Sequence, residues 1–189
     1  MNEAVRKRRL FVGIELDDAA RGACAAVADR LCRTGYAAKY ELPEKLHITL
    51  AFLGYVEPVR VGDVAAAMRE IAKGAPRLDV TLDKLGAFPH ERKPRVVYVG
   101  AREQGAAFRG LASEVRSRYE ALGFEFRNDA VAHVTIARVK PPQRPLPLLE
   151  MVPIPLVVER LALFESVPDR ARATSRYVTL ESAPLRDAA

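Results

Sequence analysis

A short pattern that occurs twice in this sequence constrains the fold more than any other feature. Residues 47–50 (HITL) and 133–136 (HVTI) share the order His, apolar, Thr, apolar, 86 positions apart. Both copies lie in segments rich in β-branched and other apolar residues, which are typical of strands. Side chains of a strand point alternately to opposite faces, so His and Thr share one face and the apolar residues the other. Each copy therefore predicts a strand with one polar face, which carries His and Thr, and one apolar face, which packs on the core.

The rest of the chain alternates between patterns typical of strands and patterns typical of helices. Period-two or continuous apolar runs predict strands, and apolar residues at helical spacing after Asp17 and Asp18 predict a helix. Glycines are expected to end elements at Gly35, Gly54 and Gly123. The expected strands are residues 10–16, 46–53, 78–85, 95–100, 131–139, 157–164 and 176–180, and the expected helices are residues 18–32, 59–72 and 104–122.

The order of these elements, β-α-β-α-β-β-α-β-β-β, predicts an α+β protein of two similar halves. We expect antiparallel pairing between residues 78–85 and 95–100, which a short loop separates. Six prolines between residues 141 and 155 predict a surface connection there, since proline disrupts helices and central strands. A chain of 189 residues is long enough to bury a core and short enough to form one domain of two lobes.

Composition and charge narrow the environment in which the chain works. No apolar run approaches the roughly 18 residues of a membrane helix, and the stretch 10–16 is too short for a signal peptide. We therefore expect a globular protein of the cytoplasm with no membrane partner. The net charge of +6 favours an anionic partner such as nucleic acid. The basic run at residues 6–9 is by itself more typical of a solvated tail.

The two cysteines are expected to be free. Cys24 and Cys32 are eight residues apart in an expected helix, which places them about 12 Å from each other at a rise of about 1.5 Å per residue. A disulfide would require the helix to break, and two thiols without CxxC spacing do not form a zinc site. Free thiols agree with a reducing compartment.

Two such His/Thr strands placed side by side about a pseudo-two-fold axis would direct two imidazoles and two hydroxyls into one cleft. This arrangement suits phosphodiester chemistry. One imidazole takes a proton from the attacking oxygen while the other gives one to the leaving oxygen. The hydroxyls of Thr49 and Thr135 can donate hydrogen bonds to phosphate oxygens in the transition state. The scheme, with His47 and His133 as acid and base, requires no metal and no cofactor.

Three other interpretations compete with this one. A single His-x-Thr is usually an ordinary strand segment, but two of the three histidines in the chain fall in matching contexts. His90 follows a proline in a polar loop and is interpreted as a surface residue. A metal hydrolase with His47, His90 and His133 as ligands lacks the HxH or HExxH pair that usually forms a local chelate. A module that binds RNA ends without catalysis would not need both histidines and both threonines.

The same motifs identify a resemblance to a known family. The chain resembles the 2H phosphoesterase superfamily and, within it, the RNA 2′,3′-cyclic phosphodiesterases, also called 2′-5′ RNA ligases. The resemblance covers almost the whole chain and is specific through its motifs in combination. These motifs are residues 9–12 (RLFV), 46–54 (LHITLAFLG), 94–100 (PRVVYVG), 133–140 (HVTIARVK) and 163–166 (LFES).

This resemblance implies a bilobal fold and a reaction. The fold would have two pseudo-symmetric halves, each with an antiparallel sheet and flanking helices, and the active-site cleft between them. The reaction would hydrolyse a 2′,3′-cyclic phosphate to a 2′-phosphate, with His47 as proton donor to the leaving 3′ oxygen and His133 as acceptor from water. The family's cleft arginine, five residues after the second histidine, falls on Arg138. Strict alternation would put Arg138 on the opposite face from His133, so the likeness requires a bulge, a twist or a long reach. Ala132 replaces the family's proline before the second histidine, which affects the approach to the strand more than the chemistry.

The resemblance leaves the substrate open. Related enzymes act on cyclic nucleotides, ADP-ribose cyclic phosphate or oligoadenylates, and the two His-x-Thr copies do not distinguish among them. The same site can also run in reverse as a 2′-5′ ligase, because a cyclic phosphate and a free 5′-hydroxyl are the reverse partners of a comparable displacement. We expect an RNA with a 2′,3′-cyclic phosphate end as partner, with tRNA fragments as one candidate, and a monomeric protein.

Overall fold

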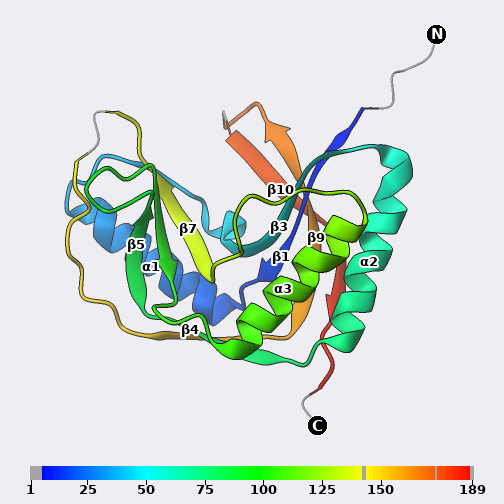
Figure 1. The fold of residues 1–189 in the computed structure, drawn as a ribbon. Coiled ribbons are helices and arrows are strands. Elements are labelled where there is room, and N and C mark those ends of the chain that lie inside the picture. Colours follow the sequence, from blue (N-terminus) through cyan, green and yellow to red (C-terminus); the bar gives the residue numbers. More distant parts are fainter. Residues whose placement is uncertain (1–5, 142–143, 173, 188–189) are drawn as a thin grey trace.

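An eight-stranded antiparallel sheet runs through the computed structural model, which describes residues 6–141, 144–172 and 174–187. The strand order is β10-β9-β1-β3-β7-β6-β5, and β2 pairs with the side of β7 (Figure 1). β4 and β8 form a separate two-stranded sheet. The strands are β1 (Arg8–Glu15), β2 (Lys39–Tyr40), β3 (His47–Val56), β4 (Leu78–Leu82), β5 (Lys84–Phe88), β6 (Val96–Gly100), β7 (His133–Arg138), β8 (Ile154–Val158), β9 (Arg160–Asp169) and β10 (Thr174–Pro184).

Three α-helices cover one face of the large sheet. α1 (Asp18–Arg33) packs on β7 and β8, α2 (Val61–Gly74) packs on β9 and β10, and α3 (Ala106–Ala121) packs on β3 and α2. α1 follows β1 in the chain yet covers β7, whereas α3 precedes β7 yet covers β3. Each of these two helices therefore covers a strand of the other half of the sheet, and the two halves do so in the same way (Figure 1). The α+β class with antiparallel sheets and flanking helices is confirmed.

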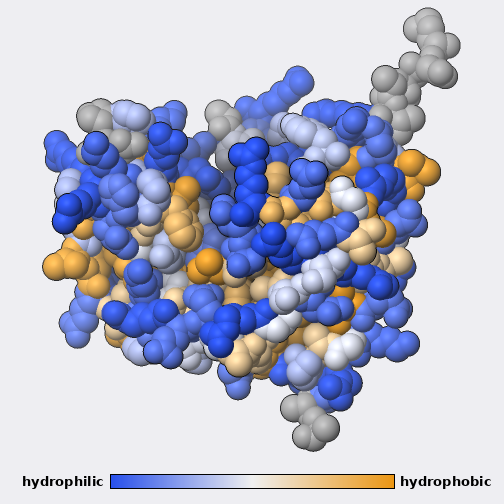
Figure 2. All heavy atoms as spheres, viewed as in Figure 1, coloured by the Kyte–Doolittle hydropathy of each residue, from blue (hydrophilic) through white to orange (hydrophobic). Residues whose placement is uncertain are grey.

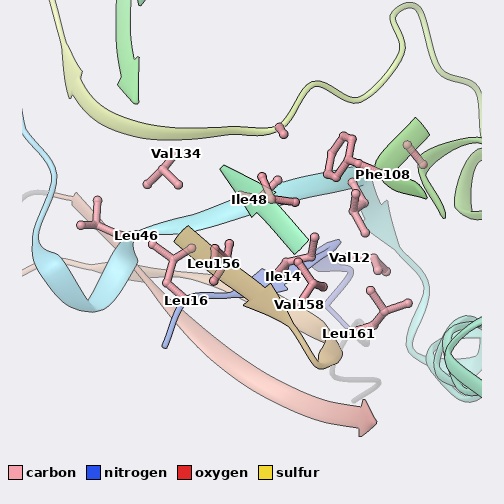
Figure 3. Packing of buried hydrophobic residues seen from close by; sticks show 14 of the residues in the cluster. Val12, Ile14, Leu16, Leu46, Ile48, Phe108, Val134, Leu156, Val158 and Leu161 are labelled. Carbon is pink, nitrogen blue, oxygen red and sulfur yellow. The ribbon is translucent and has the colours of Figure 1, made fainter. Parts of the chain in front are cut away.

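The two halves meet where β3 lies beside β7. Ile48 and Val134 are the one register pair between these strands among the described residues. Both side chains are fully buried and point into a core that is continuous across the two halves (Figure 3). The apolar residues of the two repeated patterns therefore form the seam of the molecule.

The ends of α1 follow from local sequence. Asp17 is the N-cap and accepts a hydrogen bond from the Ala20 amide at 2.7 Å, as its position before the helix predicts. Gly35 has a φ of +75° just after the helix, a conformation that glycine adopts without a Cβ clash. Cys24 is buried, Cys32 is exposed and both are free, as predicted. Burial raises the pKa of the Cys24 thiol to about 12.

Two expected strands are wrong in extent, because each divides between the two sheets. Residues 78–85 form β4, which pairs with β8, and the start of β5, which pairs with β6 as expected. Residues 157–164 likewise divide at Glu159 into the end of β8 and the start of β9. Neither segment contains a glycine or proline at the division, and periodicity alone does not mark where a strand leaves one sheet for another.

The proline-rich stretch and Gly54 also differ from expectation. Pro155 lies inside β8, which tolerates it because β8 pairs with β4 alone among the described strands and an edge strand leaves amides unused. Most of the preceding stretch has no helix or strand, as predicted, and Pro142 lies outside the described residues. Gly54 does not end its strand: it has a φ of +71° within β3, which continues to Val56.

On the face shown in Figure 2, hydrophilic residues predominate and hydrophobic residues lie among them. None of the helices in the described part of the chain is long and apolar enough to cross a membrane.

Candidate active site

The register between β3 and β7 places the two repeated patterns against each other. With Ile48 opposite Val134 in an antiparallel pair, His47 lies toward Thr135 and Thr49 lies toward His133. Directly opposed residues of two strands project from the same face. All four polar side chains therefore project from one face of the sheet, while the helices cover the other. The predicted juxtaposition of the two His-x-Thr copies is present.

A cavity of about 420 Å³ opens on this face. Four of the five predicted site residues line it, namely His47, Thr49, Thr135 and Arg138. His133 is not on its wall. The sheet register still places His133 next to this group, one residue from the seam at Val134.

Two matching bulges set which residues face the cavity. Leu50 has no partner in the β1–β3 register, and Ile136 has none in the β6–β7 register. Each extra residue lies three positions after its histidine and reverses the alternation that follows. Phe52 and Arg138, each five positions after its histidine, thereby join the histidine face and line the cavity. Of the bulge, twist or long reach that would bring Arg138 to this face, the structure has the bulge in β7.

Both imidazoles are oriented by the same kind of hydrogen bond. His47 Nδ1 lies 2.6 Å from the Lys45 carbonyl oxygen, and His133 Nδ1 lies 2.8 Å from the Val131 carbonyl oxygen. Since a carbonyl oxygen only accepts, Nδ1 carries the proton in both rings and donates it. Nε2 is then the nitrogen of each ring that is left to exchange protons. The Thr49 hydroxyl lies 3.0 Å from Nε2 of His47 and donates to it when the ring is neutral.

Aromatic rings surround His47. Its ring centroid lies 4.9 Å from that of Phe11, 5.7 Å from that of Phe164 and 5.1 Å from that of Tyr177. Phe11 and Phe164 are register partners on β1 and β9 and stack on each other at 4.8 Å. This packing limits the motion of the imidazole and removes water from most of its surface.

His133 has an equivalent environment in the other half. Phe88 and Tyr98 stack at 4.5 Å, and their centroids lie 5.1 and 5.4 Å from the His133 ring. Tyr98 lies directly over Gly86, where a Cβ would come within 2.6 Å of the tyrosine oxygen. Glycine at position 86 therefore leaves room for the Tyr98 ring, which meets His133 edge to face.

Burial shifts both histidines in the same direction. Burial lowers the pKa of His47 from its usual value, the hydrogen bond to the Lys45 carbonyl raises it, and the nearby charge of His133 lowers it. For His133, burial lowers the pKa and the hydrogen bond to the Val131 carbonyl opposes it. The net pKa of each imidazole is below the usual value, so in the free protein both rings favour the neutral form near neutral pH.

A buried ion pair borders the cavity beside His47. Lys45 Nζ lies 2.5 Å from Glu41 Oε2, and the two side chains are only 6% and 11% exposed. Arg138 Nε also donates to Glu41, at 2.9 Å. Burial would raise the pKa of Glu41, but the hydrogen bonds and charges of Lys45 and Arg138 lower it overall. One carboxylate thus holds two cations at the cavity wall.

Sequence reasoning missed several residues of this site. Glu41 follows the two-residue strand β2, which is too short to show a periodic pattern. Lys45 is two positions before the first histidine, where its carbonyl orients that ring, and this offset is repeated by Val131 in the second copy. The repeated offset was the available signal. The aromatic residues come from β1, β5, β6, β9 and β10, and only the sheet order brings them to the histidines.

His90 is a surface residue, as predicted, and does not line the cavity. It is exposed in the loop after β5, where its Nδ1 accepts from the Lys93 amide at 3.3 Å. Within residues 6–141, 144–172 and 174–187, no three His, Cys, Asp or Glu side chains are grouped so as to hold a metal ion.

Comparison with known proteins identifies the family of this chain. Residues 14–98 match the model of the LigT-like phosphoesterases. A relative from Archaeoglobus fulgidus named RNA 2′,3′-cyclic phosphodiesterase is 35% identical over 132 residues, which cover 70% of this chain and 73% of the relative. The chain belongs to the LigT-like phosphoesterase family. The resemblance found in the sequence is confirmed.

Solved structures of LigT-like phosphoesterases share the whole fold. TT0787 of Thermus thermophilus has a TM-score of 0.82 and 27% identity, with 95% of this chain and 98% of that chain covered. Escherichia coli LigT complexed with 3′-AMP has a TM-score of 0.76 and 25% identity with the same coverage. The likeness therefore extends over nearly the whole of both chains.

Proposed function

We propose that this LigT-like phosphoesterase hydrolyses 2′,3′-cyclic phosphate ends of RNA to 2′-phosphomonoesters. The observation that carries the proposal is the pair of half-buried imidazoles, each fixed through Nδ1, on one face of the joined strands β3 and β7. The relatives named RNA 2′,3′-cyclic phosphodiesterase support the substrate class. All of the proposed groups come from one chain, so a monomer suffices.

The two imidazoles would divide the proton transfers. Nε2 of neutral His133 accepts a proton from water as the water oxygen attacks phosphorus. Nε2–H of protonated His47 gives a proton to the 3′ oxygen as the bond from that oxygen to phosphorus breaks. The products are a 2′-phosphomonoester and a free 3′-hydroxyl. The two threonine hydroxyls and Arg138 would bind the non-bridging oxygens, whose charge increases in the transition state. No metal takes part in this scheme.

The proposal is tested with an oligonucleotide that ends in a 2′,3′-cyclic phosphate. Incubation in excess EDTA should give a product whose phosphate remains on the 2′ oxygen, as read by chromatography against 2′- and 3′-phosphate standards. A 3′-phosphate product would contradict the assignment of the leaving oxygen. Loss of activity in EDTA would contradict the metal-independent scheme. Adding an RNA with a free 5′-hydroxyl tests the reverse reaction, 2′-5′ ligation, in the same mixture.

A small cyclic nucleotide is the second candidate substrate. The cavity of about 420 Å³ is near the small end of ligand sites, and the neighbouring E. coli LigT was solved with the mononucleotide 3′-AMP. Comparable kcat/KM values for a 2′,3′-cyclic mononucleotide and for the oligonucleotide would favour this candidate over an RNA end.

Removing either threonine hydroxyl should weaken transition-state binding. Thr49→Val and Thr135→Val keep the side-chain volume nearly constant, and each is expected to cost about 1.5 to 3 kcal/mol, the range for a hydrogen bond to a charged group. The measurement is kcat/KM on the cyclic-phosphate oligonucleotide. Thr81→Val on β4 is the matched control, because Thr81 is an exposed strand threonine outside the site. Unchanged kinetics in both site variants would show that the hydroxyls are ordinary strand groups.

The rate should depend on pH as a bell, since one imidazole starts neutral and the other starts charged. The pKa of each imidazole is lowered in the free protein, so kcat/KM should be highest below the usual imidazole pKa of about 6.5. A bound phosphate anion raises both pKa values, so the optimum of kcat should lie at higher pH. Measuring kcat and kcat/KM from about pH 4.5 to 8.5 checks this. Equal pH optima for kcat and kcat/KM would contradict this prediction. The apparent pKa values of the two limbs describe the coupled pair of histidines and do not assign either limb to one residue.

A further inference from the structure

A second hollow adjoins the histidine cavity. It has a volume of about 380 Å³ and shares Arg9, Ser166, Thr174 and Ser175 with the cavity wall. The register between β1 and β9 runs from Leu10 to Gly13. Arg8 and Arg9, at the start of β1, have no register partner in β9, and the hollow lies between this part of β1 and the end of β9. Figure 1 shows the start of β1 and the β9–β10 hairpin projecting at the same end of the molecule. The two spaces are therefore continuous along one face.

The second hollow is basic. Four basic residues line it, Arg6, Lys7, Arg8 and Arg9, together with a single carboxylate, that of Glu165. Arg8 pairs with Glu165 at 2.6 Å, and Lys7 pairs with a glutamate outside the hollow at 2.7 Å. Arg6 and Arg9 form no ion pair with any residue that the structure describes. Two guanidinium groups are thus available to an anion at the start of β1.

Exposed aromatic rings accompany these arginines. A second bulge in β3 leaves Leu53 without a partner in the β1–β3 register, so Tyr55 returns to the face that carries His47 and Phe52. Phe52 is 46% exposed and Tyr55 is 71% exposed. The Arg9 guanidinium lies 4.8 Å from the Phe52 ring centroid. β3 therefore presents a row of aromatic side chains that leads outward from the histidine.

The size of the histidine cavity and the charge around it indicate which way a longer RNA would extend. A cavity of about 420 Å³ holds a small ligand, so a longer RNA must leave it. On the side of Arg138, the carboxylate of Glu41 reduces the net positive charge that a further phosphate would meet. On the side of Arg9, two guanidiniums without an ion pair to a described residue occur together with exposed aromatic rings. Surfaces that bind single-stranded nucleic acid through phosphates and stacked bases have the same composition.

We propose that the hollow between the start of β1 and the β9–β10 hairpin binds the single-stranded RNA that precedes the reacting end. Arg6 and Arg9 contact its phosphates, and Tyr55 stacks on one of its bases. This inference rests on the proposed function, since it takes the cyclic phosphate to lie beside His47 and His133. It gives the basic run at residues 6–9 a role beyond that of a solvated tail.

The test compares a short and a long substrate in the double variant Arg6→Gln/Tyr55→Ala. Both residues line the hollow but not the histidine cavity. We expect KM for a ten-nucleotide RNA with a 2′,3′-cyclic phosphate end to rise about tenfold, because one stacked base and one phosphate contact are lost. The kcat/KM value for 2′,3′-cyclic CMP should stay unchanged. The salt dependence of RNA binding should fall by about one charge.

Two further variants serve as controls, one for the loss of an arginine and one for the loss of the tyrosine hydroxyl. Arg118→Gln removes an exposed arginine of α3 that forms no ion pair with a described residue, and it should leave both substrates unaffected. Tyr55→Phe keeps the ring and should retain the wild-type KM for the ten-nucleotide RNA. An unchanged KM in the double variant, or equal losses on both substrates, overturns the proposal.

A failure of the proposed function gives a different result. In that case the wild-type protein turns over neither substrate. Fluorescence anisotropy with a ten-nucleotide RNA that ends in a 2′-phosphate then tests the hollow alone. Binding about tenfold weaker in the double variant than in the wild type supports an RNA site there. Equal affinities overturn it.

Discussion

Replacing either His47 or His133 with alanine is expected to lower kcat on a 2′,3′-cyclic phosphate about 10²- to 10⁴-fold, the usual range for one general acid or base. Both rings are fixed through Nδ1 and packed against aromatic side chains, so alanine removes the proton carrier from a site where water is a poor substitute. The double variant should lose less than the product of the two single losses, because the residues act as a unit.

His90→Ala is the matched control for these two variants. His90 is the remaining histidine of the chain, is exposed and does not line the cavity, so its removal should leave kcat unchanged. Near-normal turnover in His47→Ala or His133→Ala would refute the two-histidine mechanism.

A substrate with sulfur in place of the 3′ oxygen assigns the acid and the base. A thiolate leaves without protonation, so this substrate should largely rescue His47→Ala and remove the high-pH limb of the rate profile. His133→Ala should stay slow, because the attacking water still needs a base. Rescue of His133→Ala in its place would reverse the two roles.

Glu41→Gln is expected to destabilise the protein by about 3 kcal/mol, because it leaves the buried ammonium of Lys45 without its carboxylate. We expect the low end of the range for breaking a buried pair, since Thr174 Oγ1 at 3.3 Å and the Tyr177 ring at 5.2 Å still contact the ammonium. Chemical denaturation at pH 7 measures the loss. Glu44→Gln is the matched control three residues away, where the pair with Arg172 is exposed and contributes at most about 1 kcal/mol.

The effect of Glu41→Gln should also depend on pH. The pKa of Glu41 is lowered in the folded protein, so its carboxylate stabilises the fold above the unfolded-state pKa of about 4.3. That stabilisation is lost as pH falls through the lower folded-state pKa, so wild type and variant should converge in stability there. Glu41→Gln/Lys45→Met should regain most of the loss, since it removes the unpaired charge. Equal losses in the double and single variants would show that the unpaired ammonium is not the cause.

The elements of the fold were largely predictable from local patterns. The repeated His-x-Thr segments, the cap at Asp17 and the glycine at position 35 act over a few residues, and β3, β7 and α1 formed where those residues predict. The division of residues 78–85 between two sheets was not predictable, because it depends on pairing with β8, whose residues lie 72 to 80 positions later in the chain. Non-local pairing leaves no periodic signal in either segment.

Some residues of the candidate site were likewise predictable from local sequence, and others were not. The chemistry of His47 and Thr49 follows from residue type and alternation. The places of Phe52 and Arg138 follow from bulges at Leu50 and Ile136, which neighbouring strands impose and which the sequence does not mark. Glu41 comes from a strand of two residues and joins the site only through the fold.

The different aromatic surroundings of the histidines also make each of them observable by magnetic resonance. His47 lies against Phe11, Phe164 and Tyr177, His133 lies against Phe88 and Tyr98, and neither set of rings surrounds His90. The circulating electrons of a nearby ring shift the resonance of an imidazole C–H proton by an amount that depends on the position of that ring. The three imidazoles should therefore give three separate proton signals, and one titration of the unaltered protein can follow acid and base together.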